Sequence, residues 1–328
     1  MAAIVIFQFI FLTSCLASAI IPHANTVKAI ESRQISKDGR CGIDFGTVCQ
    51  PDECCSSTGW CGNGYLYCSG PACQLDFGPA CDANVRPDGP NTEDIARPKL
   101  GNVPYGSAIY HCEEYGDIAL SYDDGPYDYT EELLNILAKY KAKATFFITG
   151  RNLGKGAIND AQYPWRKLIQ RMVRDGHQIA SHTWTHQRLT TLSYEKFRNQ
   201  IIFNEIALAD ILGFFPTYLR PPYSASNATV DAWLGELGYH VTYFNLDTEG
   251  YLHDSPTAIQ ESKHIWDEAV EGQNPKDTKW LGIEHDPNYQ SVHNLTEYML
   301  QSLFRNGFRS VTVGECLGDA AVNWYRKV

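Results

Sequence analysis

The sequence predicts an α/β protein, a distorted (β/α)7-type barrel preceded by a small disulfide-rich domain. Three observations lead to this fold class: strand-like runs alternate with helical stretches through residues 107–318, cysteines crowd into residues 41–81, and a segment rich in Pro and Gly separates the two. The chain has 328 residues, 44% of them hydrophobic, which is enough for one large core and one small domain.

The N-terminus has the pattern of a secretory signal peptide. Residues 4–12 form a short apolar run, and residues 17–19 (Ala-Ser-Ala) are the small residues that signal peptidase requires. We therefore expect a signal peptide over residues 1–19, an N-terminal segment over residues 20–40, and a secreted protein that is extracellular or associated with the cell wall. The alternative is an ordinary buried segment, because no charged residue precedes Lys28. No other run reaches the roughly 20 apolar residues of a membrane helix, so no membrane span is predicted.

Residues 41–81 hold eight of the eleven cysteines and few aliphatic residues, so disulfides must hold this segment together. Composition does not choose among the roughly 105 pairings that eight cysteines allow. A zinc site is the alternative, which the adjacent Cys54 and Cys55 and the exported context disfavour. The eight cysteines are Cys41, Cys49, Cys54, Cys55, Cys61, Cys68, Cys73 and Cys81.

The order of motifs in this segment, CCS followed by GWCG and YC, resembles the hevein-type chitin-binding module over the whole of residues 41–81. The resemblance implies that Ser56, Trp60 and Tyr67 bind N-acetylglucosamine, with the rings stacked on sugar faces. Thr58 occupies one aromatic position of the family, which removes a stacking surface. Exposed aromatic rings on a rigid frame offer contact area at low entropy cost. The alternative is that the two rings fill a very small core.

Residues 82–106 are rich in Pro, Gly, Asn and Asp and are predicted to form a semi-stiff linker, and residues 319–328 a C-terminal tail. The net charge of −11 disfavours nucleic acid as a partner, because phosphate binding needs clustered Lys and Arg. A neutral or cationic partner suits an acidic protein better.

The alternation beyond the linker implies parallel strands joined by right-handed crossovers, hence a barrel or an open doubly wound sheet. Seven expected strands favour an incomplete barrel. The expected strands cover residues 117–122, 143–149, 177–180, 218–220, 240–246, 280–284 and 309–313. The expected helices cover residues 130–140, 163–175, 193–212, 228–237, 256–271 and 292–306.

Local signals mark the ends of these helices. Asp128 and Glu131 are spaced as a capping pair, and Ser255-Pro256 fits the N-cap and first helical positions. Four glycines follow expected C-termini, where a left-handed residue commonly ends a helix. They are Gly176, Gly213, Gly238 and Gly307.

Polar motifs follow five of the expected strands, and in a parallel barrel functional side chains gather at the C-terminal strand ends. The motifs are SYDDG, SHTWTH, RPPY, an aspartate after the fifth strand, and IEH. Each has an ordinary explanation when taken alone: a turn for the adjacent aspartates, a buried histidine, a loop arginine. Their joint placement on successive strand ends indicates one site.

In their order, the five motifs resemble those of the polysaccharide deacetylases, carbohydrate esterase family 4, over roughly residues 107–316. The resemblance implies that Asp124, His182 and His186 hold a divalent metal. Two imidazoles and one carboxylate suit Zn²⁺ best, with Co²⁺ as the alternative, and leave positions open for water and substrate. We therefore expect the catalytic domain to cover residues 107–318.

The same resemblance implies roles for five further residues. Asp123 is the general base, kept ionised by Arg220, and His285 is the general acid. Asp247 is expected to tune His285, and the backbone N–H of Tyr223 to face the oxyanion.

The chain departs from the family pattern at two positions. Asp247 is followed by Thr-Glu-Gly-Tyr where the family has Trp, and Ile283 replaces a leucine. We expect Tyr251 and Ile283 to line the pocket for the acetyl methyl group instead.

The predicted function is a chitin deacetylase that acts as a monomer on chitin or chitin oligosaccharides and releases acetate. Within the same chemistry, xylan and peptidoglycan are alternative substrates. A catalytically idle chitin-binding protein and a glycoside hydrolase are rivals. The full set of motif residues disfavours the first, and adjacent Asp123 and Asp124 suit a metal better than two carboxyls about 5–9 Å apart.

Two further features are assigned no function. Cys112 precedes the first expected strand of the barrel and Cys316 follows the last, so a disulfide between them would tie the barrel ends together. Asn227 and Asn294 lie in glycosylation sequons of an exported protein.

Overall fold

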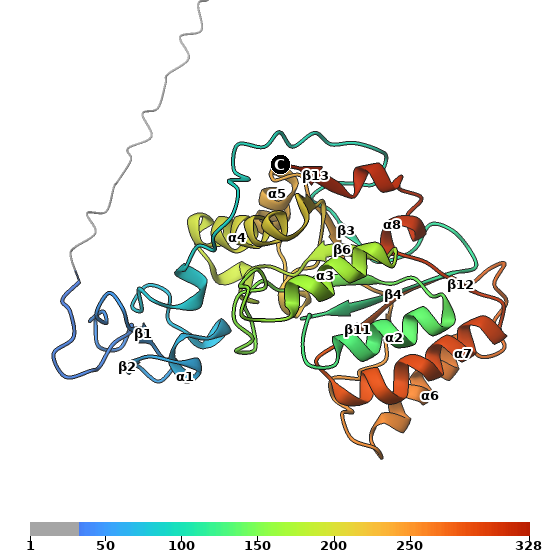
Figure 1. Ribbon diagram of the computed structural model, residues 1–328, viewed down its shortest axis with the longest axis horizontal. Coiled ribbons are helices and arrows are strands. Elements are labelled where there is room, and N and C mark those ends of the chain that lie inside the picture. Colours follow the sequence, from blue (N-terminus) through green and yellow to red (C-terminus); the bar gives the residue numbers. More distant parts are fainter. Residues whose placement is uncertain (1–32) are drawn as a thin grey trace, which may run out of the picture. The chain divides into compact units, whose positions relative to one another are not determined.

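A sheet of nine strands, all paired in parallel, forms the centre of the larger part of the chain (Figure 1). The strand order is β10-β11-β4-β5-β6-β8-β9-β3, with β12 paired to β4 off this path. Among the described residues no pairing closes β10 on β3, so the prediction of an incomplete α/β barrel is confirmed. The strands are β3 (Ala108–Ile109), β4 (Asp117–Asp123), β5 (Thr145–Ile148), β6 (Gln178–Ser181), β8 (Tyr218–Leu219), β9 (His240–Thr242), β10 (Leu246–Asp247), β11 (Trp280–His285) and β12 (Arg309–Ser310).

The computed structural model describes residues 33–328. The predicted signal peptide over residues 1–19 and most of the predicted segment 20–40 lie outside the described residues. Residues 34–328 form one compact unit. Within the described part of the chain, every helix is too short or too polar to cross a membrane.

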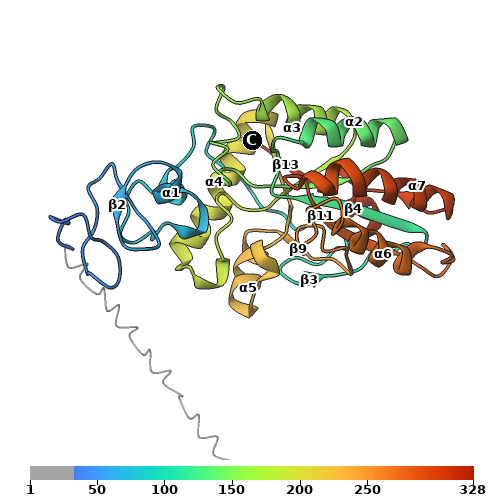
Figure 2. The same cartoon turned by 90° about the horizontal axis from the view of Figure 1, so that it is seen from below.

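Helices pack on the outside of the sheet because each presents an apolar stripe to it. In α2, for example, Leu133, Leu134 and Leu137 are fully buried. Helices α2, α7 and α6 lie next to one another in Figures 1 and 2. The helices are α2 (Thr130–Tyr140), α3 (Trp165–Arg174), α4 (Tyr194–Leu212), α5 (Ala228–Glu236), α6 (Ile259–Val270), α7 (Glu297–Arg305) and α8 (Val313–Cys316), with 3-10 turns η3 (Leu189–Thr191), η4 (Pro222–Ser224) and η6 (Ala321–Asn323).

The structure differs from the predicted elements in several places. The expected strand 240–246 is two strands, because β9 and β10 belong to opposite ends of the sheet path. The expected helix 292–306 begins as a π-helical segment, η5 (Ser291–Thr296). Strand β3 pairs with β9 although it is only two residues long, too short for its sequence to show.

The four glycines lie at the C-terminal ends of helices as predicted, but the predicted capping pair does not form. Gly213 is a left-handed C-cap with φ of 76°, and the other three glycines also have positive φ. The Asp128–Glu131 capping prediction is wrong, since Tyr129 is the N-cap of α2 and Thr130 Oγ1 accepts a hydrogen bond from the N–H of Tyr127. Helix α6 begins at Ile259 rather than at the expected Pro256, although the Ser255 hydroxyl accepts from the N–H of Ala258.

The eight cysteines of residues 41–81 form four disulfides, which replace the apolar core that this segment lacks. The pairs are Cys41–Cys55, Cys49–Cys61, Cys54–Cys68 and Cys73–Cys81. The elements between them are the antiparallel strands β1 (Cys54–Cys55) and β2 (Cys61–Gly62), helix α1 (Tyr65–Cys68) and turn η1 (Gly70–Ala72). We call residues 41–81 the cysteine-rich module.

The segment 82–106, expected as a spacer, lies against the barrel. It begins with turn η2 (Asp82–Asn84). Arg97 forms a buried ion pair with Glu205 of α4, and the Thr92 hydroxyl donates to the same carboxylate, both at 2.8 Å. A free linker would leave Glu205 as an unpaired buried charge, which is costly. The expected C-terminal tail is also part of the fold, because β13 (Tyr325–Lys327) pairs antiparallel with β7 (Phe214–Pro216).

A fifth disulfide joins Cys112 to Cys316, across 204 residues. Cys316 ends α8, which lies at the amino ends of two strands: Val313 N–H donates to Thr145 Oγ1 of β5, and Gly314 N–H to Gln178 Oε1 of β6.

Candidate active site

All five polar motifs lie at carboxyl ends of strands of the parallel sheet. Asp123, Asp247 and His285 are the last residues of β4, β10 and β11, and His182 and Arg220 directly follow β6 and β8. In-register parallel pairing sets His285 beside Asp123. The strands therefore deliver these side chains to one edge of the sheet.

Asp124, His182 and His186 bring one ligand atom each to a common point, with all three atoms within 4.8 Å of one another. The Nε2 atom of His186 lies 3.5 Å from Asp124 Oδ1, and that of His182 lies 4.0 Å from the same oxygen. These separations are close to those between ligands on one ion, so the donor set fits a divalent cation.

The backbone at and near these residues has positive φ angles, which residues other than glycine rarely adopt. Asp124, Thr183 and His186 have φ of 75°, 72° and 57°. Such residues cost about 1–3 kcal/mol each and persist only where the surroundings hold them. Both segments that carry the predicted ligands therefore contain strained residues.

Asp123 and Arg220 form a fully buried ion pair. The guanidinium donates from Nη1 to Asp123 Oδ1 at 2.6 Å and to Ser121 Oγ at 2.9 Å, and from Nη2 to the Tyr243 carbonyl at 2.8 Å. Both side chains are at most 2% exposed. The arginine fixes one carboxylate oxygen of Asp123 and leaves the other, Oδ2, 3.7 Å from His182 Nε2 and facing the cavity.

Backbone contacts and burial set the state of the two histidines. His182 Nδ1 lies 2.8 Å from the Arg220 carbonyl, which makes Nδ1 the protonated nitrogen and leaves the Nε2 lone pair toward Asp124. Burial lowers the pKa of His186 to about 4, so this ring is neutral at pH 7. Burial raises the pKa of Asp124, but the neighbouring His186, His182, His285 and Lys155 together hold it below its usual value.

His285 lines the same cavity as Asp123. Its Nδ1 is buried and, within residues 33–328, accepts or donates no hydrogen bond. The Asp247 carboxylate, which is expected to tune His285, accepts hydrogen bonds from the Glu249 N–H at 2.8 Å and from the Tyr251 hydroxyl at 3.4 Å. The Tyr251 ring stands edge-on to His285, with centroids 5.2 Å apart, and so joins the two indirectly.

The motif residues enclose a cavity of about 470 Å³. Tyr251 and Tyr223 are half exposed at its walls, and Ile283 is buried in it. Tyr223 lies in turn η4, with its ring 4.6 Å from that of His186. Phe244 and Ser224 also line the cavity, although no sequence signal singles them out.

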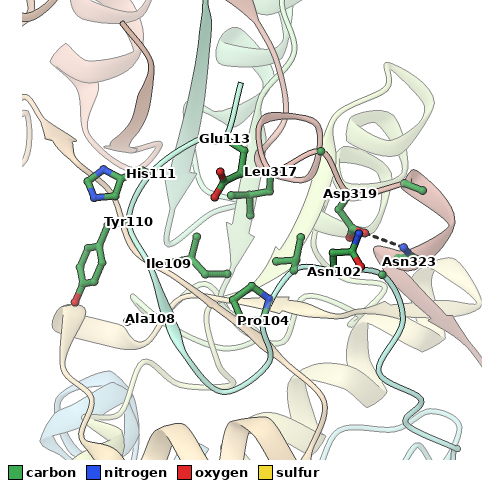
Figure 3. A pocket seen from close by; sticks show the side chains of 14 residues that line it. Asn102, Pro104, Ala108, Ile109, Tyr110, His111, Glu113, Leu317, Asp319 and Asn323 are labelled. Carbon is green, nitrogen blue, oxygen red and sulfur yellow. Dashed lines mark hydrogen bonds between the residues drawn. The ribbon is translucent and has the colours of Figure 1, made fainter. Parts of the chain in front are cut away.

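A second cavity, of about 620 Å³, lies near the C-terminal end of α8 and is lined by none of the motif residues (Figure 3). Ile109 and Pro104 supply apolar walls, and the Asp319 carboxylate there is held by Asn323 at 2.7 Å.

Sequence reasoning missed a buried lysine that contacts the turn after β4. Lys155 Nζ donates to the carbonyls of Asp124 and Gly125 at 2.8 and 2.9 Å, and so fixes the turn that presents Asp124. Asp286 accepts from Thr130 Oγ1 at 2.5 Å and packs so closely on Gly125 that a Cβ there would lie 2.0 Å from its oxygen. This explains the glycine of the DDG motif. Lys155 lies in a Gly-Lys-Gly loop, where nothing in its neighbours indicates burial.

Comparisons with known proteins cover the same part of the chain. The family described as "Polysaccharide deacetylase" matches residues 111–242. A chitin deacetylase of Pestalotiopsis sp is 39% identical over 238 residues, 73% of this chain and 76% of that protein. A chitin deacetylase of Colletotrichum lindemuthianum is 39% identical over 239 residues, 72% of this chain and 92% of that protein.

The solved structure of the chitin deacetylase from Colletotrichum lindemuthianum superposes with a TM-score of 0.65, at 39% sequence identity, over 68% of this chain and 97% of that one. The fold, the strand-end site and the relatives thus agree over the same residues. The chain belongs to the polysaccharide deacetylase family.

Proposed function

We propose that this chain is a secreted, monomeric, metal-dependent chitin deacetylase, which hydrolyses the N-acetyl group of N-acetylglucosamine units in chitin or its oligomers and releases acetate. One observation carries the proposal: the Asp124, His182 and His186 cluster lies in a cavity with the buried carboxylate of Asp123 and with His285 on its walls.

Asp124, His182 and His186 are the proposed metal ligands, and two imidazoles with one carboxylate favour Zn²⁺. When bound, the metal supplies Lewis acidity toward the acetamide oxygen and the attacking water.

The protein's own groups then perform the proton transfers. Asp123 accepts a proton from the attacking water, and Arg220 holds this carboxylate in place. An amide nitrogen leaves poorly as an anion, so His285 donates a proton to it as the C–N bond breaks. The N–H of Tyr223 stabilises the developing oxyanion, and Tyr251 with Ile283 encloses the acetyl methyl group.

Asp247 acts on His285 through Tyr251, since its hydrogen bonds go to that hydroxyl and to the backbone.

The cysteine-rich module supports chitin as the polymer. Trp60 is 45% exposed, with the Arg40 guanidinium 4.0 Å from its ring centroid, and Tyr67 packs on Gly62. The Ser56 hydroxyl accepts from the Trp60 N–H at 3.1 Å, so Ser56 also holds the aromatic residue in place. We assign sugar stacking to Trp60 and Tyr67.

Acetate release from chitin oligomers and from acetylated xylan, with and without chelator, tests the proposal. We expect release from chitin oligomers that stops on metal removal and returns with Zn²⁺. Activity that withstands complete metal removal would contradict the mechanism. Tight chitin binding without any release would favour the rival function, a catalytically idle chitin-binding protein.

A further inference from the structure

The cysteine-rich module is bonded directly to the loop that carries His186. The side chain of Gln187, the next residue, donates from Nε2 to the carbonyl of Gly70 in the module at 3.0 Å, and this hydrogen bond is buried. Gly70 is itself buried, with φ of 45°, and a Cβ there would lie 3.3 Å from Asn152 Oδ1. The module backbone therefore approaches the barrel closely at this point.

A second set of bonds comes from Asp82, the residue after the last cysteine of the module. Its carbonyl accepts a buried hydrogen bond from Trp184 Nε1 at 3.0 Å, and its carboxylate pairs with Arg151 at 2.9 Å. The Cys73–Cys81 disulfide closes the chain between Gly70 and Asp82. Both contact points thus belong to one cross-linked segment.

The loop that receives these bonds is strained. Thr183 and His186 both have left-handed φ values, and the ring of Trp184 between them is fully buried. On the barrel side the loop is held by backbone bonds from Gly150 to Thr183 and from Arg151 to Trp184, at 3.1 and 2.6 Å. Strained residues stay in place only where several contacts hold them, and two of those contacts come from Gly70 in the module and from Asp82 directly after it.

The same contact region reaches the other predicted ligand. Asn152, which faces Gly70, donates from Nδ2 to Asp124 Oδ1 at 3.3 Å. Arg151, which pairs with Asp82, is its chain neighbour. The module therefore contacts residues next to both His186 and Asp124.

We propose that the cysteine-rich module is a positioning element of the metal site as well as a sugar-binding module. Held by Gln187 and by the Asp82–Arg151 pair, it fixes the loop that presents His186. This inference rests on the proposed function, because it takes Asp124, His182 and His186 as the metal ligands. It implies that the contact matters for a substrate too short to reach Trp60.

The test is the variant Gln187→Leu in the full chain, with Gln178→Leu as the matched control. Gln178 is equally buried, and its side chain bonds to the N–H of Gly314 at the opposite end of the barrel. Zn²⁺ affinity is measured by competition with a chelator, and kcat and KM on the chitin disaccharide. We expect about a 10-fold weaker Zn²⁺ affinity and a lower kcat at similar KM for Gln187→Leu, and a Zn²⁺ affinity within about twofold of the parent for the control.

A charge exchange keeps the test decisive if Gln187→Leu does not fold. Asp82→Arg and Arg151→Asp are each expected to weaken Zn²⁺ binding, and the double variant to recover most of the loss, because it restores the ion pair. Parent-like Zn²⁺ affinity in both single variants, or a double variant no better than the singles, overturns the inference. A parent protein that binds no metal and is insensitive to chelator instead overturns the proposed function.

Discussion

The variant Asp123→Asn separates the proposed base from the rest of the site. Asparagine keeps the size of the side chain and an oxygen that can accept from Arg220, but it cannot take a proton from water. A general base contributes about 10²–10⁴-fold to rate, so the loss of transition-state stabilisation should be about 3–5 kcal/mol.

The variant also removes the counter-charge of a buried arginine. Breaking a buried pair costs about 3–5 kcal/mol when nothing replaces the lost partner. Arg220 retains its bonds to Ser121 and to the Tyr243 carbonyl, so we expect a loss of stability below that range. Zn²⁺ affinity should persist, because Asp124 and both histidines are unchanged.

The assays are acetate release, chelator competition and denaturant unfolding. Asp117→Asn is the control, because Asp117 pairs with Arg309 at 2.7 Å at the other end of the same strand, β4. We expect it to lose stability without a matching loss of kcat. Acetate release near the parent rate in Asp123→Asn, with metal bound, would refute the assignment of the base.

Three further predictions concern pH, the long disulfide and sugar binding. Burial raises the pKa of Glu284, the middle residue of the IEH motif, to about 8. The folded protein therefore holds a proton that the unfolded chain loses above its usual pKa, and the contribution of this group to stability should fall between about pH 4.5 and 8 by about 1.4 kcal/mol per pH unit. Glu284→Gln should remove this slope in urea unfolding, and an unchanged slope would contradict the argument. Replacing Cys112 and Cys316 by Ser releases a loop of 204 residues and should cost about 2–5 kcal/mol in denaturant unfolding, so an unaltered midpoint would count against this disulfide as a source of stability. Trp60→Ala should weaken retention on chitin beads by roughly 1 kcal/mol, about fivefold, and unchanged retention would remove Trp60 from the binding face.

The placement of the five motifs was predictable because the alternation of strands and helices along the chain implies parallel strands joined by crossovers. Once β4, β6, β8, β10 and β11 are parallel, residues that follow each strand meet at one edge without any knowledge of packing. The glycine stops were predictable for a similar reason, since a left-handed C-cap depends on one residue and its own helix.

The remaining features depend on contacts distant in sequence. Lys155 is buried because the carbonyls of Asp124 and Gly125 come to it from about 30 residues away. The segment 82–106 has the composition of a linker, and its place in the fold is revealed by contacts distant in sequence, such as the Arg97–Glu205 pair, 108 residues apart.

The family, the parallel barrel and the residues at its strand ends could be predicted from the sequence, because periodicity, turn residues and motif order are properties of short stretches of chain. How those residues are held in place became visible from the three-dimensional structure. It revealed the Lys155 support, the indirect link from Asp247 to His285, and the bonds from the cysteine-rich module to the His186 loop. A hydrogen bond between buried groups forms only where donor and acceptor meet in the folded protein. A pattern in one stretch of sequence describes only one of these two groups.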